Sequence, residues 1–183
     1  MSKESTVTNK QKNVKPKSRR RMQIGISFTI IVVALVVIFM PKKIENHTSA
    51  STAAPMFKKH GELTLTKSNG KSVVSIDIEI ADDDAKREVG MMGRPVMEEH
   101  QGMLFVFDEE FLASFWMRNC PLSLDMIFIN KQEKIVTIHK NTKPFSDDSY
   151  SATAMTLFVL EVNAGFTDKY GIKEGDMISW KRN

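Results

Sequence analysis

The stretch from Gly102 to Asp125 concentrates side chains that could bind a ligand or take part in catalysis. Trp116, Arg118, Asn119 and Asp125 bring an aromatic ring, a guanidinium, an amide and a carboxylate within ten residues. Arginine and asparagine donate hydrogen bonds to anionic or hydroxyl groups, and a tryptophan ring offers a flat surface for stacking. This combination predicts a binding cleft for a carbohydrate or an anionic small ligand.

Three further charged residues lie in or beside apolar segments. Leaving such a charge buried and unpaired costs several kcal/mol, so each must be paired or must line a cleft. Structural ion pairing is therefore the alternative interpretation of these charges. With them, the predicted ligand-binding set is Arg87, Arg94, Trp116, Arg118, Asn119, Asp125 and Glu161.

The same set offers one candidate for catalysis. Asp125 and Glu161 could serve as acid and base of a hydrolase or lyase acting on envelope carbohydrate, if the fold brings them within ~5 to 9 Å. Cys120 has no local base beside it, so it is interpreted as a small packed residue rather than a nucleophile. Catalytic residues are left unassigned, and a binding or envelope-associated module is favoured over an enzyme.

Metal binding has a weaker basis in the sequence. Thioethers and a thiolate at Cys120 would suit Cu(I), but methionine is also a common core residue, and no repeated ligand spacing is present. The histidines are isolated and show no metal-ligand spacing. We therefore predict neither a metal nor a cofactor. The methionines concerned are Met91, Met92, Met97, Met103, Met117 and Met126.

Apolar runs separated by turn residues predict the elements that position these side chains. An Asn-Gly turn between the first two runs indicates a hairpin, and the later spacing is typical of sandwiches and barrels. We expect a mostly β fold, an antiparallel β-sandwich or jelly-roll-like domain of about eight strands. The runs are 62–66, 73–80, 103–107, 113–118, 124–130, 134–139, 156–163 and 176–180.

One short helix interrupts the strands. Aspartates at 82–84 provide an N-cap and first-turn carboxylates, apolar residues recur at helical spacing, and Gly93 before Arg94-Pro95 indicates the end. This predicts a helix of about ten residues. Residues 141–153 are expected to form a long polar loop, and 166–170 one helical turn.

The N-terminal third differs from the rest in composition. Residues 22–40 carry no charge in 19 positions, enough for a helix of about 28 Å, close to the hydrocarbon thickness of a membrane. Eight basic residues precede this run and two follow it, which places the N-terminus in the cytoplasm. We predict a basic arm (1–21), a transmembrane anchor (22–40), a flexible tether (41–60) and an extracytoplasmic β domain (61–183).

This organisation predicts a single-pass protein of the bacterial cytoplasmic membrane. A cleaved signal peptide is the alternative, although the apolar run is longer than the usual central region of such a signal. Residues 61–183 hold 14 Lys/Arg against 20 Asp/Glu, so the predicted domain is acidic. An acidic domain without a basic stripe excludes nucleic acid as the expected partner.

Five blocks of sequence occur in order along 61–183: REVGMMGRPVM (87–97), GMLFVF (102–107), FWMRN followed by LD (115–129), VLEVNAG (159–165) and IKEGD (172–176). With these blocks the chain resembles a known family, domain of unknown function 192. They cover nearly all of 61–183, and the resemblance implies a compact β-sandwich or jelly-roll-like domain, frequently exported, with no established activity. The chain departs from the family pattern at Cys120, where a threonine is usual, so no role that needs a hydroxyl is expected there.

Overall fold

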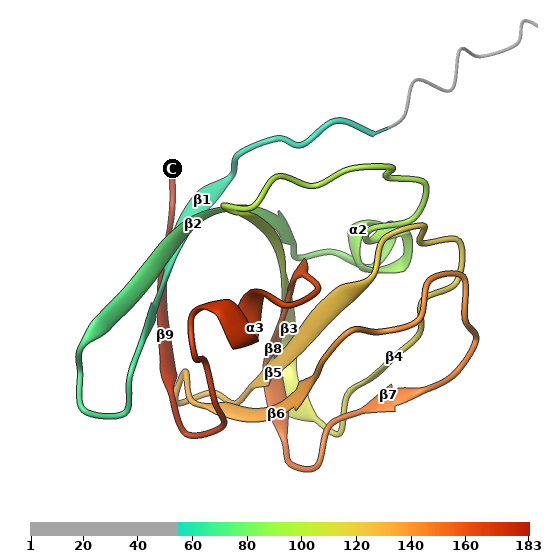
Figure 1. Cartoon of the computed structure of the whole chain (residues 1–183). Helices are drawn as coiled ribbons and strands as arrows, with labels where there is room; N and C mark the ends of the chain where they lie inside the picture. The colour runs from blue at the N-terminus through green and yellow to red at the C-terminus, as the bar shows by residue number, and fades with distance from the viewer. Residues whose placement is uncertain (1–54) are drawn as a thin grey trace, which may run out of the picture. The chain divides into compact units, whose positions relative to one another are not determined.

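A computed structural model describes residues 55–183 (Figure 1). The predicted basic arm and transmembrane segment lie outside the described residues, as does the predicted tether up to residue 54. Within 55–183, no helix combines the length and the apolar character needed to cross a membrane. The last residues of the predicted tether run beside the sheet, where the His60 amide donates a hydrogen bond to the Ile78 carbonyl at 2.8 Å.

The described residues form nine strands and two short helices. The elements are β1 (Gly61–Thr66), β2 (Ser72–Ala81), α2 (Asp84–Val89), β3 (Gln101–Phe111), β4 (Ser114–Phe115), β5 (Leu124–Ile129), β6 (Ile135–His139), β7 (Tyr150–Ser151), β8 (Thr156–Asn163), α3 (Phe166–Lys169) and β9 (Met177–Arg182).

Seven strands make one mixed sheet in the order β6-β5-β8-β3-β2-β1-β9, and β4 pairs with β7 in a separate two-stranded sheet. The prediction of a mostly β fold is confirmed. The predicted antiparallel pairing is found between most neighbouring strands, whereas β2 and β3 are parallel. Residues 82–100, which include α2, connect these two strands, and a parallel pair needs a crossover of about this length.

The large sheet curls until its edge strands approach each other. Lys134, just before β6, forms an isolated antiparallel bridge with Met177 at the start of β9. The amide of Ile135 also donates to the carbonyl of Asp176 at 2.8 Å. These contacts cover part of two edges that would otherwise offer unpaired backbone groups.

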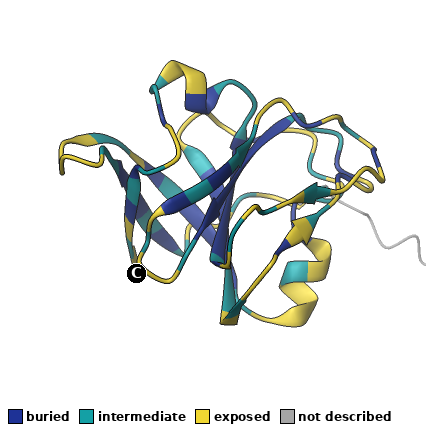
Figure 2. Cartoon of the chain, turned by 90° about the horizontal axis from the view of Figure 1, so that it is seen from below, coloured by how far each residue is buried: buried dark blue, intermediate teal, exposed yellow. Residues whose placement is uncertain are grey.

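The two faces of the curled sheet carry separate apolar clusters. One contains Leu63, Leu65, Ile76, Ile78, Leu104, Ile127, Leu160 and Val162, with residues of β6 and β9. The other contains Met103, Phe105, Met117, Cys120, Leu124, Met126, Phe128 and Val159. Residues of β4 and β7 pack on the second cluster, so the small sheet covers it. Figure 2 shows buried residues along the central strands and exposed ones in loops and helices.

The local predictions are confirmed, although several strand boundaries differ from the predicted ones. Each of the eight predicted runs overlaps a strand, whereas β7 lies inside the predicted polar loop. Asp83 is the N-cap of α2, and its carboxylate accepts from the Lys86 amide at 2.8 Å. The helix ends earlier than predicted because Gly90 already has φ +46°, a conformation that few other residues adopt.

Candidate functional site

A groove lined by aromatic residues opens beside the small sheet. It has a volume of about 400 Å³ and lies between α2, β3, β4 and the loop before β7. We call it the outer groove. Its lining residues are Arg87, Glu88, Phe107, Phe111, Ser114, Phe115, Trp116, Asp147 and Ser149.

Trp116 forms a wall of this groove and is held there by Arg118. The guanidinium of Arg118 lies 3.8 Å from the centre of the indole ring, a stacked cation–π contact. The Arg118 Nε also donates to the Asp147 carboxylate at 2.7 Å, which fixes the arginine. Trp116 nevertheless remains 48% exposed, so much of its surface is available for contact with a ligand.

Three phenylalanines continue the apolar lining. The ring of Phe107 meets that of Phe111 edge to face at 4.7 Å, and Phe115 lies 6.3 Å from Phe107 in the same manner. The ring of Phe115 also packs edge to face against the buried ring of Phe105, with 5.0 Å between the ring centres. Contacts of this geometry are favourable and restrict ring motion, so the groove is largely preformed.

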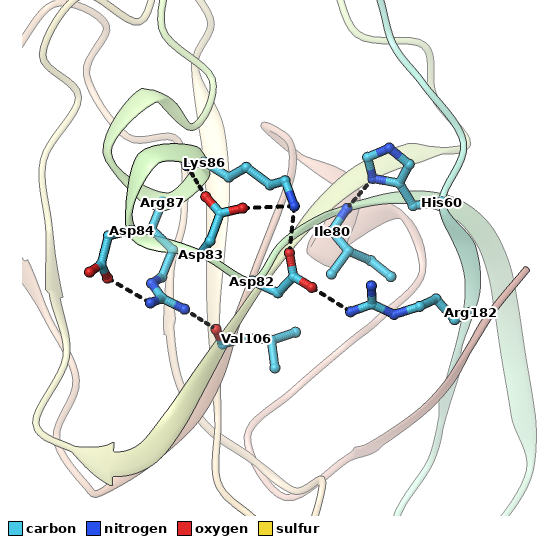
Figure 3. Close-up of polar contacts among 9 residues, drawn as sticks. All are labelled: His60, Ile80, Asp82, Asp83, Asp84, Lys86, Arg87, Val106 and Arg182. Atoms are coloured by element: carbon cyan, nitrogen blue, oxygen red, sulfur yellow. Dashed lines mark hydrogen bonds and ion pairs between the residues drawn. The ribbon is translucent and has the colours of Figure 1, made fainter.

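Arg87 closes the groove where α2 approaches β3. Figure 3 shows its guanidinium donating to the Asp84 carboxylate and to the Val106 carbonyl, each at 2.7 Å. The same group lies 5.3 Å from the centre of the Phe107 ring. Arg87 therefore fastens the helix to the sheet and forms part of the groove lining at the same time.

A second, narrower pocket adjoins the outer groove. It has a volume of about 40 Å³, which is room for an ion or a few water molecules. We call it the inner pocket. Its lining residues are Arg87, Glu88, Val89, Gly90, Met91, Met92, Phe105, Phe115, Trp116, Met117, Arg118, Cys120 and Glu161.

Glu161 is the most unusual residue of the inner pocket. Its side chain points to the second cluster, opposite Met103 of β3 and Met126 of β5, and the residue is 4% exposed. Among residues 55–183, none makes a hydrogen bond or ion pair with its carboxyl group. Burial raises its pKa to about 8, because the charged form is poorly solvated there.

Cys120 lies close to Glu161 in the same pocket. Its thiol is buried and donates a long hydrogen bond to the Leu122 carbonyl, with 3.7 Å between sulfur and oxygen. Burial raises the pKa of this thiol to about 11, and the nearby Glu161 carboxyl contributes to the increase. The thiol is therefore protonated at neutral pH and is not an activated nucleophile.

The fold thus brings together four of the seven predicted residues, namely Arg87, Trp116, Arg118 and Glu161. Asn119 lies at the edge of this group, and its side-chain nitrogen is 4.0 Å from the Met92 sulfur. Its φ of +55° belongs to the left-handed region, which asparagine tolerates better than most residues. Asn119 therefore shapes the turn after β4 beside the pocket.

Arg94 is engaged in an ion pair elsewhere. Its guanidinium lies 2.5 Å from the carboxylate of Glu79 on β2, and both side chains are largely buried. The backbone amide of Lys58 donates to the same carboxylate. This is the structural ion pairing that was the alternative interpretation, and Arg94 lines neither the outer groove nor the inner pocket.

Asp125 is buried in a separate polar cluster. Its carboxylate accepts hydrogen bonds from the backbone of Asn141 and Gly165 and from both the amide and the hydroxyl of Thr167. Such a carboxylate has little capacity left for a ligand, and it lines neither cavity. The predicted role of Asp125 in ligand binding is not supported, since its partners are all structural.

Sequence reasoning missed most of the aromatic lining. Phe107 and Phe115 belong to predicted strands that read as core segments, and Phe111 lies between these two runs. Only the three-dimensional packing shows that one side of these rings is open. Asp147 and Ser149 fall in the polar loop, where no pattern distinguished them. A usable signal was present in the run of four aromatic rings within ten residues, from Phe107 to Trp116.

Fold and site together define a mostly β domain with an aromatic groove next to a buried acid. Its family follows from the sequence as a whole: residues 64–180 match the family DUF192, described as Uncharacterized ACR. The chain belongs to this family, as the resemblance predicted.

Two solved structures are similar to this chain, each with 33% sequence identity. One is a protein from Sinorhizobium meliloti described as a proposed transcription regulator, with a TM-score of 0.65, covering 69% of this chain and 98% of its own. The other is a protein of unknown function from Novosphingobium aromaticivorans, with a TM-score of 0.62, covering 65% and 84%. No curated protein matches the chain.

Proposed function

We propose that this chain is a binding module that holds a carbohydrate in the outer groove. The observation that carries the proposal is the exposed indole of Trp116, fixed by Arg118 and flanked by phenylalanines. A sugar ring presents an apolar face and a polar edge. The groove offers the same division, since hydroxyl and carboxylate groups of Ser114, Ser149 and Asp147 border the aromatic surface.

The cellular setting is part of the same proposal and is supported by the sequence. The apolar run 22–40 and the charge asymmetry around it would anchor the chain in the cytoplasmic membrane, with the β domain outside. A module in that position would meet glycans of the cell envelope. The acidic balance of residues 61–183 argues against a nucleic-acid ligand for this chain.

The alternative of a hydrolase or lyase has less support. It requires Asp125 and Glu161 to flank one bond, but only Glu161 lines the inner pocket. The four hydrogen bonds that Asp125 accepts are all structural. We therefore favour binding without turnover.

The test is a binding titration of the full chain in detergent with soluble envelope oligosaccharides, both neutral and uronic-acid-containing. Trp116→Ala should weaken binding roughly tenfold or more, which corresponds to about 1.4 kcal/mol. Trp180→Phe is the matched control, because Trp180 packs against Phe158 and does not line the groove. Equal binding by wild type and Trp116→Ala would contradict the proposal.

Arg118 allows the two ligand classes to be distinguished. Its Nε is used by Asp147, while the two terminal nitrogens make no hydrogen bond to any of the residues 55–183. These nitrogens could pair with a carboxylate of an acidic sugar. Arg118→Gln should therefore lower affinity for uronic-acid oligosaccharides more than for neutral ones. An equal loss for both would assign Arg118 to support of Trp116 alone.

A further inference from the structure

The inner pocket is lined by sulfur-containing residues from segments that are far apart in the sequence. Met91 follows α2, while Met117 and Cys120 lie in the turn after β4. All three residues are buried, with exposures of 5%, 1% and 4%, and all three line the same small space. The sequence shows no metal-ligand spacing because these residues come from different segments, and only the fold brings them together.

Glu161 supplies a second and independent reason to expect a ligand in this pocket. The residue is only 4% exposed and lines the pocket, and none of the residues 55–183 makes a hydrogen bond to its carboxyl group. Proteins ordinarily satisfy a buried acid with a donor or a cation. Here the neighbours across the sheet are the methionines Met103 and Met126, which cannot donate a hydrogen bond.

The donor set and the volume limit the class of ligand. A space of about 40 Å³ admits an ion but not an organic molecule. Within the described residues, no cluster of three His, Cys, Asp or Glu could hold a metal, which argues against zinc and calcium. Thiolate and thioether donors instead select soft ions such as Cu(I).

We propose that the inner pocket binds a soft monovalent cation of the Cu(I) class through the sulfur atoms of Cys120, Met91 and Met117. Binding replaces the thiol proton of Cys120, which is released to solvent, so one positive charge enters and one leaves. Glu161 lies beside the thiol and stabilises the positive charge of the ion with its carboxyl oxygen. The inner pocket shares Arg87 and Trp116 with the outer groove, but this proposal does not depend on carbohydrate binding.

Two sulfur contacts are compatible with this role. The Met117 sulfur lies 3.2 Å from the buried hydroxyl oxygen of Thr142, whose single proton it shares with the Leu124 carbonyl at 3.0 Å. That contact uses one lone pair of the thioether and fixes the orientation of the side chain, and a second lone pair remains. Among residues 55–183, the thiol of Cys120 makes one hydrogen bond, its long contact to the Leu122 carbonyl, which ends when the thiol proton leaves.

The experiment uses the full chain, purified in detergent with its thiol reduced and the reductant removed. Cu(I) is titrated anaerobically against a chromophoric chelator, and Ag(I) serves as a redox-inert probe. Wild type should bind one ion and release one proton. Cys120→Ser should abolish binding, and Met91→Leu and Met117→Leu should each weaken it tenfold or more.

Met97→Leu is the matched control, because Met97 is buried in the same apolar cluster but does not line the pocket. Leucine replaces methionine with little change in volume, so circular dichroism should show all three methionine variants folded. The extended fine structure of the copper X-ray absorption spectrum should show three sulfur neighbours of the ion in wild type and fewer in each pocket variant. Unchanged Cu(I) affinity in both Met91→Leu and Met117→Leu would show that the thiol alone binds the ion, and this would overturn the proposal. Failure of the wild type to bind Cu(I) would overturn it as well.

Discussion

Asp125 and Glu161 lie on neighbouring strands but point to opposite faces of the sheet. In the β5–β8 register, Asp125 is opposite Val162, whereas Glu161 is opposite Met126. Cross-strand partners share a face, and successive residues alternate between faces. The two acids therefore have different environments and different consequences when they are changed.

Asp125→Ala should cause a large loss of stability. The substitution leaves the amides of Gly165 and Thr167, at the start of α3, without their acceptor. Unsatisfied buried donors cost about 1–3 kcal/mol each, so we expect a loss of at least 3 kcal/mol in the free energy of unfolding. Urea denaturation followed by tryptophan fluorescence measures it.

Thr167→Val is the control for Asp125→Ala. It removes only the hydroxyl bond to Asp125, which has an oxygen–oxygen distance of 2.6 Å, and keeps the backbone bond. Its expected cost is about 1 kcal/mol. A loss below that value for Asp125→Ala would show that the carboxylate is not the organising acceptor of this cluster.

Glu161→Gln should change how stability depends on pH. The pKa of Glu161 is about 8 in the folded chain against an ordinary value of 4.5, so the folded state keeps a proton that the unfolded state loses. Stability of wild type should therefore fall as pH rises from about 4.5 to about 8, and this contribution should level off above that range. The variant should lack this fall and be more stable than wild type by a few kcal/mol at pH 8.

Glu174→Gln is the surface control for Glu161→Gln, since Glu174 is exposed. Unfolding curves at pH 5, 7 and 9 should show a changed pH dependence of stability for Glu161→Gln and the wild-type dependence for Glu174→Gln. Parallel pH profiles for wild type and Glu161→Gln would mean that a donor or cation already satisfies the buried carboxyl.

The comparison of these two acids explains why the site could be predicted only in part. Both residues are carboxylates within apolar strands, and nothing in their immediate sequence distinguishes them. Asp125 is satisfied by groups from residues 141 to 167, and that contact exists only once α3 packs against the sheet. The dense stretch around Trp116 and Arg118 did indicate the groove, because both residues follow β4 directly and stack on each other.

The strands themselves were more accessible to prediction. Alternation of apolar and polar residues reports a half-buried strand directly, so runs such as 73–80 are clear. The two residues of β7 are too few to show any period, and the parallel pairing of β2 with β3 depends on how the crossover packs. The order of the strands in the sheet, and the bridge between Lys134 and Met177 that joins its two edges, likewise arise only when the whole sheet is assembled.

Cys120 should react slowly with thiol reagents in the folded chain. Its pKa of about 11, against an ordinary 9.0, lowers the thiolate fraction at pH 8 by about 100-fold, and burial restricts access further. Reaction with a chromogenic disulfide should therefore be at least about 100-fold slower in buffer than in concentrated urea. Comparable rates in the two conditions would show that the inner pocket is open to solvent.

Gly61→Ala should destabilise the pairing of β1 with β9. A Cβ atom at position 61 would lie 2.3 Å from the carbonyl oxygen of Lys181, which is backbone and cannot move without separating the strands. Overpacking of this kind typically costs about 1–3 kcal/mol. Thr64→Ala on the same strand introduces no such contact and should cost less than about 1 kcal/mol. Amide hydrogen exchange of β9 is the measurement, because exchange should accelerate there in Gly61→Ala and stay near the wild-type rate in Thr64→Ala. If β9 remains equally protected in Gly61→Ala, the close approach of the two strands at this edge is not a constraint on the fold.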